Sequence, residues 1–138
     1  MVGILIIAHG TLGESLIQCA SHVFGGTPPQ LQQLGVTGRD DPNAIIQQAR
    51  EAIARLDDGT GVLVLTDIYG ATPSNLACRL LEPGRVECVA GVNLPMLVRA
   101  LTYRNNEPLE KLAEKASSGG REGVVHVTRE ICDVTARR

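Results

Sequence analysis

Two residues suited to proton or group transfer each close an apolar run of the sequence. His9 ends the run from Val2 to Ala8, and Asp67 ends the run from Gly61 to Thr66. Runs that are apolar on both faces are typical of strands in a parallel sheet covered by helices. Sites in such sheets form beyond the carboxyl ends of the strands. We therefore expect His9 and Asp67 to lie close together, where a carboxylate could orient an imidazole for nucleophilic or acid–base chemistry.

A loop of small residues follows the second apolar run and leads into an expected helix. Gly70, Ala71 and Thr72 precede Pro73, an order that suits a helix with Thr72 as its N-cap and proline at its first position. Free backbone N–H groups at a helix start bind anions, and a threonine hydroxyl can donate a further hydrogen bond to phosphate. The loop carries no nucleotide-binding fingerprint. The combination favours phosphate chemistry on the imidazole itself.

Strand and helix signals alternate along the rest of the chain. They predict one α/β domain over residues 1–138, with an open, mainly parallel sheet flanked by helices on both faces. The expected strands cover residues 2–9, 31–36, 61–66 and 86–90, with a possible further strand at 124–127. The expected helices cover 12–23, 42–56, 73–81, 94–103 and 109–116. Asp41 should cap the second helix, and an apolar stripe of Met96, Leu97 and Leu101 should belong to the core or to a subunit interface.

Composition excludes several classes of function. The net charge is −2, the longest basic run is Arg137-Arg138, and only three residues are aromatic, so nucleic-acid binding is not indicated. No apolar stretch approaches the ~20 residues of a membrane-spanning helix, and the apolar start lacks the features of a signal peptide.

The cysteines and remaining histidines show no ligand spacing, so we expect no metal and no cofactor. We interpret the four cysteines as reduced, small hydrophobic residues of a cytoplasmic protein: Cys19, Cys78, Cys88 and Cys132. His22 is expected to be solvated and His126 to be structural. Asn93 and Pro95 are expected to shape a loop at the same edge of the sheet as His9.

Four blocks of sequence together resemble the enzyme IIA component of the mannose family of the bacterial phosphoenolpyruvate-dependent sugar phosphotransferase system. They occur in the expected order across most of the chain, at residues 6–10, 65–75, 90–97 and 120–124. The second block, Leu-Thr-Asp-Ile-Tyr-Gly-Ala-Thr-Pro-Ser-Asn, is the longest and most specific.

The resemblance implies a phosphoryl carrier. His9 would accept a phosphoryl group from the phosphocarrier protein HPr and pass it to a IIB component, with the membrane components IIC and IID acting downstream. Asp67 would hold one ring N–H of His9 and leave Nε2 as the nucleophile. The residues that would hold the phosphoryl oxygens are Gly70, Ala71 and Thr72.

The resemblance also implies a cytoplasmic protein, associated at most peripherally with a membrane transporter. Family members have a central four-stranded parallel sheet and are commonly homodimers. In some members a C-terminal strand is exchanged between subunits, and residues 124–127 are the candidate for that strand here.

Two departures from the family pattern keep a second function open. Members often carry Gly-Gly-Ser-Pro where this chain has Gly70-Ala71-Thr72-Pro73, and an aromatic residue often stands where this chain has Ser74. The alternative is a regulatory switch that HPr phosphorylates and that controls a partner protein without sugar transport. A third hypothesis is that the protein is a phosphotransfer subunit of a dihydroxyacetone kinase. The blocks at 66–75 and 90–97 disfavour this hypothesis.

Overall fold

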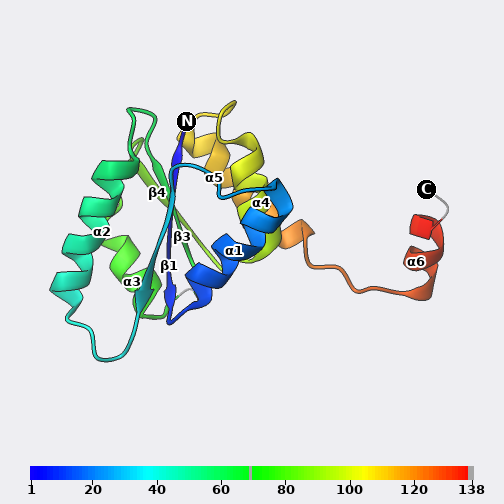
Figure 1. The fold of residues 1–138 in the computed structure, drawn as a ribbon, viewed down its shortest axis with the longest axis horizontal. Coiled ribbons are helices and arrows are strands. Elements are labelled where there is room, and N and C mark those ends of the chain that lie inside the picture. The colour runs from blue at the N-terminus through cyan, green and yellow to red at the C-terminus, as the bar shows by residue number, and fades with distance from the viewer. Residues whose placement is uncertain (69, 137–138) are drawn as a thin grey trace.

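A computed structural model describes residues 1–68 and 70–136, so Tyr69 and the basic pair 137–138 lie outside the described residues. A parallel sheet lies between two layers of helices (Figure 1). Its strands are β1 (Gly3–His9), β2 (Leu31–Val36), β3 (Val62–Thr66) and β4 (Val86–Ala90). The helices are α1 (Leu12–Phe24), α2 (Pro42–Leu56), α3 (Thr72–Cys78), α4 (Leu94–Tyr103), α5 (Leu109–Glu122) and α6 (Arg129–Ala136).

The strand order β2-β1-β3-β4 creates a switch point at the centre of the sheet. The chain leaves β1 toward β2 on one side, then returns across β1 to β3 on the other. All three strand pairs are parallel, and Ile7 of β1 stands opposite Thr66 of β3. In open α/β sheets, ligands bind beyond the carboxyl ends of the strands at such a point. The order therefore places the ends of β1 and β3, with His9 and Asp67, at the expected crevice.

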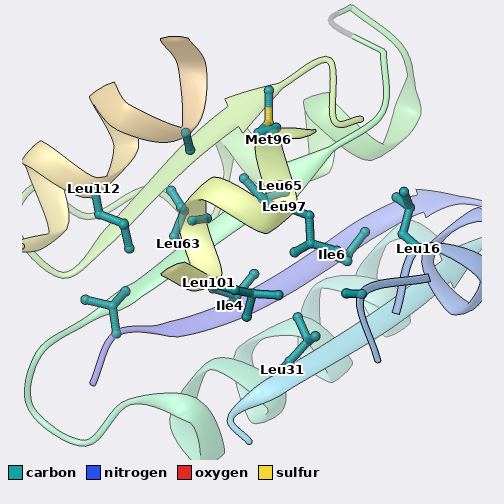
Figure 2. Packing of buried hydrophobic residues seen from close by; sticks show 14 of the residues in the cluster. Ile4, Ile6, Leu16, Leu31, Leu63, Leu65, Met96, Leu97, Leu101 and Leu112 are labelled. Carbon is teal, nitrogen blue, oxygen red and sulfur yellow. The ribbon is translucent and has the colours of Figure 1, made fainter. Parts of the chain in front are cut away.

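The alternating side chains of β1 and β3 divide the core into two clusters. Ile4, Ile6 and Ala8 face α1, α4 and α5, whereas Leu5 and Ile7 face α2 and α3. Figure 2 shows the first cluster, in which Leu63 and Leu65 of β3 pack with side chains from α4 and α5. The apolar stripe on α4 belongs to this core, as expected: Met96, Leu97 and Leu101 are all buried. Burial on both faces explains why these strands read as continuous apolar runs.

A close backbone contact at Gly3 joins the start of β1 to the end of α2. A Cβ atom at this position would lie 2.6 Å from the carbonyl oxygen of Leu56. Only glycine therefore allows this approach without displacement of the strand or the helix. The start of α2 follows the sequence prediction, because the Asp41 side chain accepts a hydrogen bond from Asn43 N at 3.1 Å and Pro42 opens the helix.

The C-terminal segment corrects two expectations. Residues 124–127 form no strand; they are extended, exposed and unpaired, and the short helix α6 follows them away from the domain (Figure 1). Helix α5 continues to Glu122 and does not end near Ala116, because Gly119 and Gly120 lie against α4, where Arg99 and Met96 occupy the space that larger side chains would need. An apolar alternation becomes a strand only where a neighbouring strand is present to pair with it.

The cysteines differ from the expected burial. Helix α1 buries Gly13, Leu16 and Ala20, and Cys19 lies off this inward face. Cys19 is consequently exposed, as are Cys78 and Cys132, and only Cys88 is partly buried. All four are free thiols, but three of them do not act as core residues. No helix in the described parts of the chain is long and apolar enough to cross a membrane.

Candidate active site

His9 and Asp67 meet at the carboxyl edge of the sheet, as the sequence predicted. The His9 Nδ1 atom lies 2.7 Å from Asp67 Oδ2, and the backbone N–H of His9 donates to the same oxygen at 2.9 Å. The other carboxylate oxygen accepts from the backbone N–H of Ile68 at 2.9 Å. Asp67 is thus fixed by three hydrogen bonds, and it fixes both the backbone and the ring of His9.

The side chains of Asp67 and His9 differ strongly in their exposure to solvent. The Asp67 side chain is 8% exposed, whereas the His9 side chain is 51% exposed. Burial raises the pKa of the Asp67 carboxyl, but hydrogen bonds from the His9 backbone, the His9 ring and the Ile68 backbone outweigh burial and lower the pKa below its ordinary value. An ionised carboxylate only accepts hydrogen bonds, so Nδ1 of His9 carries the proton. Nε2 then holds the free lone pair.

The turn from β1 into α1 brings a helix start close to His9. This helix was expected, but its N-terminus was not predicted to be part of the site. Gly10 adopts φ +54°, a left-handed conformation that glycine tolerates, and α1 begins at Leu12. The N-cap Thr11 makes no side-chain capping bond, and the first intrahelical bond runs from Ser15 N to Thr11 O. The N–H groups of residues 12–14 therefore lack intrahelical acceptors and are suited to an anion near His9. The sequence feature that could have indicated this role is the short separation between His9 and the first residue of the expected helix.

The small-residue loop after β3 is held by Ser74, whose side chain is buried. The Gly70 N–H donates to Ser74 Oγ at 2.8 Å, and that hydroxyl donates to Ala71 O at 3.1 Å. The Ala71 N–H donates to Ile68 O at 3.3 Å. The backbone donors of Gly70 and Ala71 are therefore occupied within the loop. This role of Ser74 could not be recognised from sequence, where it stood out only as a departure from the family pattern.

The start of α3 differs by one residue from the expectation. Ala71 is the N-cap and Thr72 is the first helical residue, so the Thr72 side chain does not cap the helix. Thr72 is exposed at the same edge of the sheet as His9. No hydrogen bond links Thr72 to His9 or Asp67 within the described residues. Its hydroxyl remains available to a ligand.

The remaining residues singled out in the sequence lie outside the contact between His9 and Asp67. Asn93 caps α4 by accepting from Met96 N at 2.9 Å and donates to Gly120 O at 3.0 Å, so it shapes the loop as expected. His22 is exposed, as expected, whereas His126 is exposed in the unpaired C-terminal segment and not in a strand. Within residues 1–68 and 70–136, no three His, Cys, Asp or Glu side chains gather as metal ligands would.

Comparisons with known proteins identify the family of this chain. The sequence profile of the EIIA-man family, described as the PTS system fructose IIA component, matches residues 3–117. The PTS system mannose-specific EIIAB component of Escherichia coli K12 is 33% identical over 125 residues, which are 89% of this chain and 38% of that protein. The PTS system fructose-specific EIIA component of Bacillus subtilis is 28% identical over 113 residues, which are 81% of this chain and 77% of the relative.

A solved structure shows the same architecture. The phosphotransferase system component EIIA from Streptococcus agalactiae has a TM-score of 0.81 and 25% sequence identity, and the match covers 91% of this chain and 97% of that chain. The chain spans only 38% of the mannose-specific relative, so that protein's full activity is not carried over. The profile match covers most of the chain, however, including the segments that hold His9 and Asp67. The chain therefore belongs to the mannose-type family of phosphotransferase system IIA components.

Proposed function

We propose that this protein is a phosphoryl carrier that accepts a phosphoryl group on Nε2 of His9 from phospho-HPr and passes it to a IIB component for carbohydrate uptake. The observation that supports this role most strongly is the contact between His9 Nδ1 and Asp67 Oδ2, with the rest of the imidazole exposed. A donor protein can approach an exposed ring, whereas a buried ring would be closed to it.

The transfer step needs only groups that the chain and its donor supply. The Nε2 lone pair of His9 attacks the phosphorus of the donor phosphohistidine, a new N–P bond forms, and the old N–P bond breaks with its electron pair returning to the donor imidazole. The Nδ1 proton stays on the ring and donates to Asp67, whose charge stabilises the positive charge that develops on His9. Phosphoryl transfer depends mainly on positioning and electrostatics, so a small preformed site is sufficient.

The phosphoryl oxygens would lie between the start of α1 and the loop after β3. The N–H groups of residues 12–14 and the Thr72 hydroxyl are the donors we assign to them. Gly70 and Ala71 would contribute mainly by shaping the loop, since Ser74 Oγ and Ile68 O engage their N–H groups. This role would place the protein in the cytoplasm, beside the membrane IIC and IID components that IIB serves.

We also infer a homodimer in which residues 124–127 pair with a second copy. Val124, Val125 and Val127 are all exposed and lie in a segment that pairs with no strand among the described residues. The edge strands of the sheet are β2 and β4, and unpaired edges accept an added strand. Light scattering should report a dimer for the full chain and a monomer after Val125→Asp; a monomeric full chain would contradict the exchange.

The carrier role is tested by intact mass spectrometry. The protein is incubated with enzyme I, HPr and phosphoenolpyruvate, and a gain of one acid-labile phosphoryl group is expected. His9→Ala should show no gain, whereas the matched control His22→Ala should be phosphorylated normally. Addition of a IIB component should discharge the label. A stable label that no IIB protein removes would favour the regulatory switch, and no label with active donors would contradict the proposal.

A further inference from the structure

A hollow of about 410 Å³ lies on the face of the molecule formed by α2, the segment that follows α3 and the start of β4. Arg85 comes just before β4, and Arg79 just after α3, so the hollow lies toward the amino edge of the parallel sheet. His9 ends β1 at the opposite, carboxyl edge. The hollow is therefore separate from the candidate active site, and neither the sequence motifs nor the family comparisons assign it a role.

Three arginines line this hollow, one from α2 and two from the connection between α3 and β4. They belong to Arg50 of α2, Arg79 after α3 and Arg85 before β4. Arg85 is held in place, because its Nε lies 3.2 Å from Asp57 Oδ2 and its Nη1 lies 3.2 Å from Glu82 Oε2. These two carboxylates offset the charge of one arginine only.

Arg50 and Arg79 have no carboxylate partner among residues 1–68 and 70–136. Glu82 is the single acidic side chain that lines the hollow against the three arginines, so the lining carries a net positive charge. Guanidinium groups present planar sets of N–H donors that match phosphate and carboxylate oxygens, and several of them around one hollow favour a multiply charged anion.

Apolar side chains also line the hollow. Ile53, Leu80 and Val86 are buried in the core, whereas Leu81 is 47% exposed beside them. A free inorganic anion would use the arginines but leave the Leu81 side chain in water. A ligand with an anionic group and a carbon skeleton would cover both parts.

We propose that this hollow binds a small organic phosphate, with its phosphate on the arginines Arg50, Arg79 and Arg85 and its organic part against Leu81. The site does not depend on phosphorylation of His9, and the two proposals can fail independently. A ligand here would contact α2 and residues 79–82, which directly follow α3, and α3 begins in the loop beside the candidate active site.

The proposal is tested by a residue-resolved NMR titration of the full chain with phenyl phosphate, and with inorganic phosphate as the headgroup alone. Saturable amide shifts are expected for residues 79–86, with weaker binding of inorganic phosphate than of phenyl phosphate. The double variant Arg50→Gln/Arg79→Gln should lose at least about tenfold in affinity, because it removes the two unpaired cations. Leu81→Ala should weaken phenyl phosphate and leave inorganic phosphate unchanged.

Arg39→Gln with Arg129→Gln is the matched control, since both arginines are exposed and lie outside the hollow. Unchanged affinity in the Arg50/Arg79 double variant would overturn the proposal. Shifts confined to residues 9–14 and 67–76 would also overturn it, because they would place the phosphate at the candidate active site. Binding of an acidic peptide at the hollow without binding of phenyl phosphate would assign the surface to a protein partner and contradict the proposal. Phosphorylation of the double variant by HPr, measured in parallel, shows that the fold and the carrier role are intact.

Discussion

Replacement of Asp67 by asparagine should slow phosphorylation of His9 while leaving the fold in place. One carboxylate oxygen, Oδ2, contacts both the ring and the backbone N–H of His9, at 2.7 and 2.9 Å. A hydrogen bond to a charged group contributes about 1.5–3 kcal/mol, and a neutral one about 0.5–1.5 kcal/mol. Positive charge develops on the His9 ring during transfer, so neutralising the acceptor removes about 1.5 kcal/mol of stabilisation at the ring contact in the transition state.

This energy converts to a fall in the transfer rate of about 10-fold, because ~1.36 kcal/mol corresponds to a factor of ten. The asparagine amide can also turn its NH₂ group toward Nδ1, which would move the ring proton to Nε2 and block the nucleophile. The rate is measured by rapid-quench transfer from phospho-HPr at neutral pH, with the melting temperature as a check on folding.

Asp133→Asn is the matched control, because it removes a carboxylate from the exposed helix α6. It should transfer at the normal rate. A folded Asp67→Asn protein that is phosphorylated as fast as the unchanged protein would refute the reasoning, since it would show that the contact between Asp67 and the His9 ring contributes nothing to the reaction.

Gly3→Ala should destabilise the fold by about 1–3 kcal/mol through overpacking, and Gly38→Ala, which has open space around it, should not; urea unfolding measures both. Ser74→Ala should lower the free energy of unfolding by ~1–3 kcal/mol, because it removes the buried hydroxyl that pairs with the loop backbone; an unchanged value would contradict the loop geometry. Burial raises the pKa of the Cys88 thiol to about 11, so iodoacetamide at pH 8 should modify three cysteines quickly and Cys88 only on unfolding. Hydrogen bonds from the backbone N–H groups of Gly59 and Gly61, together with Arg85, lower the pKa of Asp57 below its ordinary 3.8 despite its burial. The contribution of Asp57 to stability is therefore present above pH 3.8 and is lost as the pH falls through the lowered pKa. Asp57→Asn should make the acid limb of the stability curve shallower; an unchanged slope would contradict this assignment.

The sheet and the central pair were predictable because their signals are local and strong. The runs ending in His9 and Asp67 are buried on both faces, so each is apolar throughout, and parallel strands align their carboxyl ends. The capping of α2 was also predictable, because it depends on neighbouring residues only: the Asp41 side chain accepts a hydrogen bond from Asn43 N, and Pro42 is the first residue of the helix.

Other features depend on contacts that sequence does not reveal. The α3 boundary moved by one residue because Ser74, and not Thr72, satisfies the backbone of the preceding loop. Residues 124–127 have the apolar side chains of a strand, but strand formation requires a neighbouring strand, and these residues pair with none in the described parts of the chain. Helix α5 runs through Gly119 and Gly120 because α4 packs closely against them, although two glycines usually indicate a helix end.

The central claim is that Asp67 holds Nδ1 of His9 and leaves Nε2 as the atom that carries the phosphoryl group. The most direct test is heteronuclear ¹⁵N–³¹P NMR of the protein after phosphorylation by enzyme I, HPr and phosphoenolpyruvate. The account predicts a single phosphohistidine at His9 with phosphorus bonded to Nε2 and the Nδ1 proton retained. Phosphorus on Nδ1, or on any residue other than His9, would contradict it.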